Sequence, residues 1–429
     1  MSGNESHRAI EAVWRMEAAK VIAGLTRMVR DVGLAEDFAQ EALVAALEQW
    51  PASGIPPSPG AWLMLAAKRR AIDHFRYVAR TGQKHEEIGR SLFAMEQATP
   101  DFDAALHDHI GDDVLRLIFV ACHPVLGPEA RAALTLRVVA GLTTDEIARA
   151  FLAPEPTIAQ RIVRAKRTLA EKRIPFEVPH GLDLAARLGS VLEVIYLIFN
   201  EGYSATAGQD LIRVSLCEEG LRIGRILAEL EPHEPEVHGL VALMEIQASR
   251  SRARVGPGGE PVLLLDQNRA LWDRLLIRRG LAALERAEKL SALKGPYRLQ
   301  AEIAACHARA LAAAETDWAR IVSLYGELAA VAPSPVVELN RAVAVSMAFG
   351  PEAALGLLDP LIHDPLMRSY HLLPSVRGDV LARLGRHAEA RAEFERAASL
   401  TRNAREQKLL AERARESEQR AREAAQSGV

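Results

Sequence analysis

The chain has 429 residues, of which 49% are hydrophobic and 25% are charged, and its formal net charge is −3. This composition excludes a disordered chain, and the length predicts about three domains. The charge excludes nucleic-acid binding through bulk positive charge, so any DNA contact must come from local patches. Apolar residues recur at helical spacing throughout, which predicts an all-α protein.

The N-terminal segment MSGNESHRAI is polar, which argues against a secretory signal, and no apolar run approaches the length that a bilayer span requires. The three cysteines, Cys122, Cys217 and Cys306, are far apart and odd in number. This usage argues against a disulfide framework and fits a reducing compartment. We therefore expect a cytoplasmic protein without membrane contact.

The first informative element is a helix predicted over residues 31–50. It presents Asp37, Gln40 and Glu41 at three- and four-residue spacing, which gives an acidic and polar face suited to a basic protein surface. Its other side is expected to bury four apolar residues: Phe38, Leu43, Ala46 and Leu47.

A second helix is predicted after the turn-forming segment PASGIPPSPG at 51–60. It combines cationic and aromatic side chains, namely Trp62, Lys68, Arg69, Arg70, Phe75, Arg76 and Tyr77. Positive charge interleaved with aromatics suits the binding of a single strand and the stacking of unpaired bases. The alternative, that these aromatics belong to the core, stays open.

Residues 81–110 are predicted to form an acidic linker. Positions 91–115 contain no Lys or Arg and include six carboxylates, Glu96, Asp101, Asp103, Asp108, Asp112 and Asp113.

Residues 141–169 predict a helix-turn-helix unit. Thr143 and Glu146 form a capping box at the start of its first helix. The second helix is expected from residue 154, with Pro156 in its first turn, and with a buried stripe made by Ile158, Ile162, Ala165 and Leu169. Its other side carries DNA-binding candidates: Thr157, Gln160, Arg161, Arg164, Lys166 and Arg167. A basic bundle helix is the alternative.

Two further clusters resemble sites and are interpreted as helix ends. Cys122 and His123 have no second ligand pair nearby, so we expect no metal. A helix is expected to end at Asn200–Gly202, with Gly202 as a left-handed cap. A binding role for Glu201 and Tyr203 in a groove is the less favoured alternative.

The C-terminal part contains spacings typical of tetratricopeptide repeats. Residues 377–397 carry Gly378 and Phe394 where two antiparallel helices would approach closely. Residues 309–333 and 338–361 have related spacing. Such repeats stack into a scaffold, and a generic helix bundle is the alternative.

The motifs together resemble the extracytoplasmic-function (ECF) group of bacterial sigma factors. The resemblance rests on AED-x-x-QEA, which ends at residue 42, on AWL and AID-x-x-R within 61–76, and on the helix-turn-helix. LRLIFVACHPVL at 115–126 and EVIYLIFNEGYSAT at 193–206 resemble a long-chain subgroup with a helical extension. The implied order is sigma region 2 at 8–80, a linker at 81–110, region 4 at 111–173, a helical extension at 181–290 and repeats at 291–420.

The resemblance implies a role for each set of residues. Asp37, Gln40 and Glu41 would contact core RNA polymerase. The −10 promoter element would meet Trp62, Lys68, Arg69, Arg70 and Arg76, and the helix from residue 154 would read the −35 element. A sigma factor neither forms nor breaks a covalent bond, so no catalytic residue and no cofactor is expected.

Two other functions stay open at this point, a helix-turn-helix regulator with a helical sensor domain and a repeat scaffold. The 31–77 segment favours the sigma factor, because a simple regulator does not need it. The extension is expected to regulate the sigma part in cis, through an intramolecular contact or a protein partner.

Overall fold

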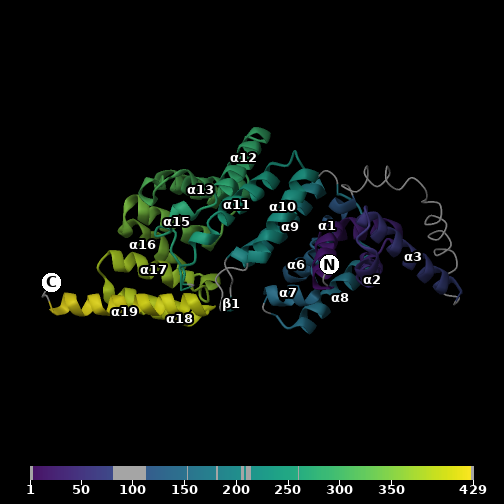
Figure 1. Ribbon diagram of the computed structural model, residues 1–429. Coiled ribbons are helices and arrows are strands. Elements are labelled where there is room, and N and C mark those ends of the chain that lie inside the picture. The colour runs from purple at the N-terminus through teal and green to yellow at the C-terminus, as the bar shows by residue number, and fades with distance from the viewer. Residues whose placement is uncertain are drawn as a thin grey trace. The chain divides into compact units, whose positions relative to one another are not determined.

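The computed structural model describes residues 3–80, 113–151, 153–179, 182–203, 207–208, 214–258 and 260–426. The predicted linker at 81–110 lies outside these ranges. The chain divides into two compact units, residues 1–198 and 199–429. The all-α prediction is confirmed, because the described residues form helices and their connections apart from two strands of two residues each (Figure 1).

Three mutually packed helices open the first unit: α1 (Gly3–Val29), α2 (Val32–Ser53) and α3 (Pro59–Arg80). Asp31 caps α2 by accepting a hydrogen bond from the Leu34 amide at 2.9 Å. The helix ends at Ser53, and the following residue, Gly54, has a φ of 81° that favours glycine. The turn predicted at 51–60 is shorter than expected, because α2 continues to Ser53 and α3 begins at Pro59. Pro51 therefore lies inside α2.

The first unit continues with helical residues at 113–121, then α6 (Pro128–Val138), α7 (Thr144–Phe151), α8 (Glu155–Glu171) and the beginning of α9 (Leu182–Tyr203). The Ser190 hydroxyl donates to the Cys122 carbonyl at 2.7 Å, and Arg187 donates to the Phe119 carbonyl at 3.0 Å. These bonds tie the start of α9 to the helix-turn-helix module. The first unit therefore extends to residue 198, whereas the sequence analysis placed the extension from residue 181.

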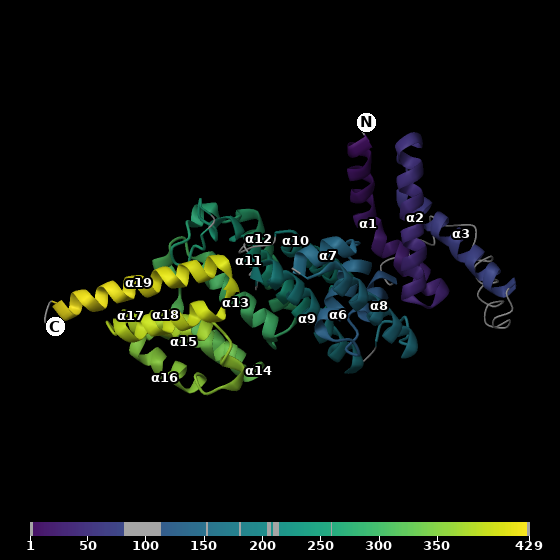
Figure 2. The same ribbon diagram turned by 90° about the horizontal axis from the view of Figure 1, so that it is seen from below.

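The second unit consists of successive helices (Figures 1 and 2). They are α10 (Val214–Leu230), α11 (Pro235–Ala248), α12 (Arg274–Leu290), α13 (Pro296–Arg309), α14 (Trp318–Val331), α15 (Pro335–Phe349), α16 (Pro351–Leu361), α17 (Leu372–Arg383), α18 (His387–Leu400) and α19 (Ala404–Gln426). Short 3-10 helices lie between them: η1 (Ser251–Ala253), η2 (Arg269–Leu271), η3 (Ala313–Glu315) and η4 (Pro365–Met367). Strand β1 (Ala207–Gly208) pairs in parallel with β2 (Arg402–Asn403), just before α19.

Two of the three expected repeat segments correspond to helix pairs. Residues 377–397 fall on α17 and α18, and residues 338–361 fall on α15 and α16. The expectation for 309–333 is wrong, because this segment joins the end of α13 to η3 and α14. Asp317 caps α14 by accepting from the Arg320 amide. Helix α14 packs against α13, which ends at Arg309, and against α15, which begins at Pro335, so both neighbours lie almost wholly outside 309–333.

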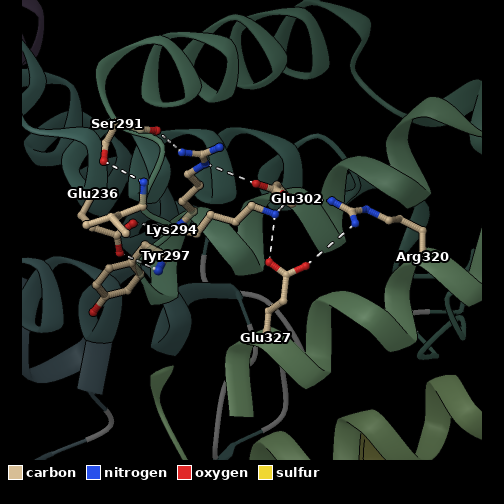
Figure 3. A network of polar contacts seen from close by, with 9 residues as sticks. Glu236, Ser291, Lys294, Tyr297, Glu302, Arg320 and Glu327 are labelled. Carbon is tan, nitrogen blue, oxygen red and sulfur yellow. Dashed lines mark hydrogen bonds and ion pairs between the residues drawn. The ribbon is translucent and has the colours of Figure 1, made fainter. Parts of the chain in front are cut away.

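Polar contacts join α11, α13 and α14 (Figure 3). The Glu236 carboxylate of α11 accepts from the Tyr297 amide at 2.8 Å, so it caps α13 from a neighbouring helix. Burial raises the pKa of Glu236, although these backbone hydrogen bonds oppose the shift. Lys294 bridges Glu302 of α13 and Glu327 of α14, each at 3.0 Å.

The Gly378→Ala substitution is expected to lower the free energy of unfolding by about 1–3 kcal/mol, because it overpacks a tight contact. A Cβ at Gly378 would lie 2.8–3.0 Å from three ring atoms of Phe394. Gly356→Ala in α16 is the matched control, since its Cβ would meet no atom within 4 Å. Urea unfolding should show a lower free energy of unfolding for Gly378→Ala and a slightly higher one for Gly356→Ala. Equal changes would contradict the predicted contact.

Candidate nucleic-acid interface

The capping box at the start of the helix-turn-helix is confirmed. The Thr143 amide donates to the Glu146 carboxylate at 2.8 Å, and the Glu146 amide donates to the Thr143 hydroxyl at 3.1 Å. Burial acts to raise the pKa of Glu146, but the hydrogen bonds from Thr143 and the charge of Arg15 leave it lowered. Glu146 therefore stays ionised and holds α7 in place.

Helix α8 buries the four predicted stripe residues, Ile158, Ile162, Ala165 and Leu169. It begins at Glu155, one residue later than expected, with Pro156 in its first turn. Four of the DNA-binding candidates, Thr157, Gln160, Arg164 and Arg167, are exposed. Arg161 is half-buried, and its guanidinium lies 2.5 Å from the Glu129 carboxylate. Arg161 must leave this ion pair before it can contact DNA.

Helix α3 separates its cationic residues between two environments. Arg69, Arg70 and Arg76 are exposed, and Arg70 forms an ion pair with Glu41 at 3.6 Å. Lys68 does not share this exposed face: it is 3% exposed, and burial lowers its pKa. The expectation that Lys68 faces DNA therefore does not fit this conformation.

The aromatic residues of α3 also differ in environment. Trp62 is half-buried and packs edge-to-face on Trp50, with ring centroids 5.2 Å apart. Phe75 lies 6.5 Å from Phe38, whereas Tyr77 is exposed. The interpretation of these aromatics as core residues therefore fits Phe75. Trp62 is partly covered by Trp50, so only its exposed part is available to a base.

The acidic face of α2 is bound by the helix-turn-helix module. Asp37 and Glu41 are exposed and Gln40 is half-buried. The Lys166 ammonium lies 3.0 Å from the Asp37 carboxylate and 2.6 Å from that of Glu36. Lys166 is thus placed against α2 and away from the exposed face of α8.

Glu36 is the centre of this contact. Its side chain is buried, and Arg137 of α6 donates to it at 2.8 Å while Lys166 of α8 bonds its second oxygen. Burial acts to lower the pKa of Lys166, but the carboxylates of Glu36 and Asp37 outweigh it and leave the pKa raised. Two cations therefore neutralise one buried carboxylate, which keeps the desolvated charge paired.

A second contact joins α1 to the helix-turn-helix module. The Trp14 indole donates to the Gly141 carbonyl at 3.2 Å in a buried position, and Arg15 forms an ion pair with Glu146. Gly141 has a φ of 71°, and a Cβ there would lie 3.1 Å from that of Ala18. The close approach of the two modules therefore requires glycine at this turn.

Sequence reasoning missed Glu36, Arg137 and Trp14. One signal for Glu36 was present, because it occupies the buried side of α2 with Ala35 and Ala39. A carboxylate among buried positions requires a cationic partner. The sequence did not indicate that the partners would come from residues about a hundred positions away.

The Cys122–His123 cluster shows no metal-ligand geometry in the part of the chain that the structure describes. The Cys122 thiol is buried, which raises its pKa to about 11, and it lies 3.3 Å from the Thr135 hydroxyl. Within the described ranges, no group of three or more His, Cys, Asp or Glu is arranged to hold a metal ion. At the other cluster, α9 continues through Gly202 to Tyr203, so the expected left-handed cap at Gly202 is wrong.

Three family models match the chain. Sigma-70 region 2 matches residues 14–81, sigma-70 region 4 matches residues 116–169, and a family of unknown function matches residues 187–288. An ECF RNA polymerase sigma factor, SigK of Mycolicibacterium vanbaalenii, is 30% identical over 38% of this chain and 80% of its own length. The chain belongs to the ECF sigma factors.

Two other relatives match the chain over different lengths. A probable ECF sigma factor, SigI of Mycobacterium tuberculosis, is 30% identical over 40% of this chain, and the match spans 58% of SigI. An uncharacterized protein of Rhizobium meliloti is 45% identical over 90% of both chains, so it shares the extension. No solved structure matches.

Membership of the family gives the function. This ECF sigma factor binds core RNA polymerase and promoter DNA and directs transcription initiation. The region 2 match decides against the simple helix-turn-helix regulator. Sigma-factor families are not enzymes. Among the described residues, no helix combines the length and apolar character needed to cross a membrane.

Proposed function

We propose that this ECF sigma factor rests in a closed state, in which its two promoter-reading modules bind each other and must separate before initiation. In the open state, Asp37, Gln40 and Glu41 contact core polymerase. The −10 element meets Trp62, Arg69, Arg70 and Arg76. The −35 element meets six residues of α8: Thr157, Gln160, Arg161, Arg164, Arg167 and, once it is released from α2, Lys166. The protein catalyses no reaction itself and acts in the cytoplasm, where the polymerase is.

One observation carries this proposal. The bond between Lys166 and Asp37 joins a residue expected to contact −35 DNA to one expected to contact the polymerase. While this ion pair exists, neither side chain is available to its external partner. Binding to polymerase therefore competes with the closed contact. The apparent affinity for core polymerase equals the affinity of the open state multiplied by the fraction of molecules that are open.

The distance between promoter elements supports the same conclusion. The −10 and −35 elements are about 25 base pairs apart, which corresponds to ~85 Å at 3.4 Å per base pair. In the closed state, atoms of α2 and α8 are in direct contact, at 2.6 Å between Lys166 and Glu36. A closed molecule cannot place its two modules on both elements, so promoter recognition requires separation.

We further propose that the C-terminal extension regulates this opening in cis. Helix α9 supports the idea, since it begins in the first unit and ends at Tyr203 in the second without interruption. Its first half is bonded to the helix-turn-helix module through Arg187 and Ser190. A change in the extension that shifts α9 therefore acts directly on the −35 module.

Truncation after Tyr203 tests this regulation. The variant of residues 1–203 retains all of α9 and the sigma modules, so we expect it to bind core polymerase but to initiate at a rate that differs at least about threefold from the full chain, a shift of ~0.7 kcal/mol. Run-off transcription with purified core enzyme measures it. Circular dichroism and core binding serve as controls for folding. Equal initiation by two folded proteins would contradict regulation in cis.

A further inference from the structure

The second unit contains a pocket of about 340 Å³ that the sigma function does not use. Four parts of the fold meet there: the end of α9, the segment from η1 to η2, the start of α17 and the start of α19. Its lining residues include cations, polar groups and aliphatic side chains. Its volume lies within the range of small-molecule sites.

Two arginines give the pocket a cationic wall. Arg250 is 9% exposed, and its Nε is buried without a hydrogen-bond partner among the described residues. Within the described ranges, the contacts of its guanidinium are to the Tyr203 and Trp272 rings, each at 5.8 Å from the ring centroid. Arg254 stacks on Tyr203 at 3.7 Å and donates to its carbonyl. A buried cation without a carboxylate is costly, so Arg250 needs an acceptor.

The other polar side chains that line the pocket do not supply an acceptor for Arg250 among the described residues. Gln267 is 8% exposed, and its side-chain oxygen has no partner among the described residues. The carboxylate that lines the pocket is Glu406, which accepts from Thr401 at 2.8 Å and lies 3.1 Å from His371. Glu406 is therefore already engaged, and the wall formed by Arg250 and Arg254 keeps an excess of positive charge.

The titration of a neighbouring histidine agrees with this excess. Burial, together with the charges of Arg250 and Arg269, lowers the pKa of His307 to about 3. His307 is thus neutral at physiological pH and adds no charge. The cationic character of this region comes from its arginines.

Aliphatic side chains form another part of the lining. Leu263 and Leu372 are exposed at its edge, while Leu409 and Leu410 of α19 line it more deeply. A cationic wall beside aliphatic side chains suits a molecule with an anionic head and an apolar body. We propose that this pocket binds a small amphipathic acid, with its carboxylate on Arg250 and Arg254 and its chain against these leucines.

Octanoate is the probe for this proposal, used with the full-length protein. We expect a saturable rise in the melting temperature and a calorimetric binding signal with octanoate, both absent with octan-1-ol and inorganic phosphate at equal concentration. Binding of octanol as tight as that of octanoate would overturn the anionic requirement. Equally tight binding of phosphate would overturn the apolar one.

Variants locate the binding in this pocket. Arg250→Gln is expected to weaken octanoate binding about tenfold or more, because a charge-assisted hydrogen bond is lost. Arg252→Gln is the matched control, since Arg252 is exposed on η1, two residues after Arg250, and is absent from the lining. Ser375→Phe fills the pocket and should abolish binding, which provides a second test if Arg250→Gln does not fold. Unchanged affinity in a folded Arg250→Gln or Ser375→Phe variant would overturn the proposal.

Discussion

Replacing Arg164 with alanine is expected to weaken binding of the polymerase holoenzyme to its −35 element between about fivefold and 150-fold, the loss of one bidentate base contact. Arg164 is exposed on α8, and its side chain makes no ion pair or hydrogen bond with other described residues. Its guanidinium is therefore available, whereas Arg161 must first leave Glu129. Competition binding between cognate and altered −35 sequences measures the effect.

The control for Arg164 is Arg167→Ala. Arg167 is exposed one turn further along α8 and pairs with Glu171 at 3.2 Å, a position suited to phosphate. Its loss should weaken binding to all sequences similarly and reduce the salt dependence by about one charge. Both variants should bind core polymerase normally. Loss of core binding by Arg164→Ala, or equal weakening on all sequences, would contradict the assignment of Arg164 to base reading.

A disulfide that locks the closed state is expected to abolish initiation reversibly. A Cβ built on Gly33 would lie 3.7 Å from the Cβ of Lys166, which falls within the 3.5–4.5 Å that disulfides require. The atom nearest to this Cβ is Asp31 Oδ1 at 2.9 Å, which caps α2, so the substitution at Gly33 must shift this cap slightly. The double variant Gly33→Cys, Lys166→Cys should lose core binding and transcription when oxidised, and regain both on reduction.

The single-cysteine variants control for the oxidant. Native Cys122 and Cys217 are buried and Cys306 is half-buried, so the single variants also report any effect of oxidising the native thiols. Each single variant should be equally active before and after oxidation. If the oxidised double variant, with its disulfide confirmed by mass spectrometry, still initiates at the reduced rate, the closed state does not inhibit.

Local sequence signals predicted the helix-turn-helix well. The capping box of Thr143 and Glu146 and the buried stripe from Ile158 to Leu169 depend on residues three or four apart, so their geometry follows from helical periodicity alone. The pairing of α17 with α18 was predicted from local spacing as well, since Gly378 and Phe394 indicate where the two helices approach closely. The segment 309–333 failed because its spacing resembled a repeat while its helix boundaries differed.

Contacts between distant segments were the part that the sequence could not indicate. Lys166 has the charge and position of a DNA-binding residue on α8, and its choice of Glu36 and Asp37 depends on how the two modules meet. Lys68 similarly lies among exposed arginines in sequence, yet it is buried. Helical periodicity separates a buried from an exposed face only within one helix, so partners on another module lie beyond it.

The most direct test of the closed state is a distance measurement by pulsed electron paramagnetic resonance on the full-length chain. Spin labels belong at Glu48 of α2 and Val163 of α8, both of which are exposed. The free protein should give one short distance, and the promoter complex with core polymerase should give a distance longer by tens of ångströms, as the ~85 Å between promoter elements requires. A free protein that already shows the long distance, or a promoter complex that retains the short one, would contradict the account.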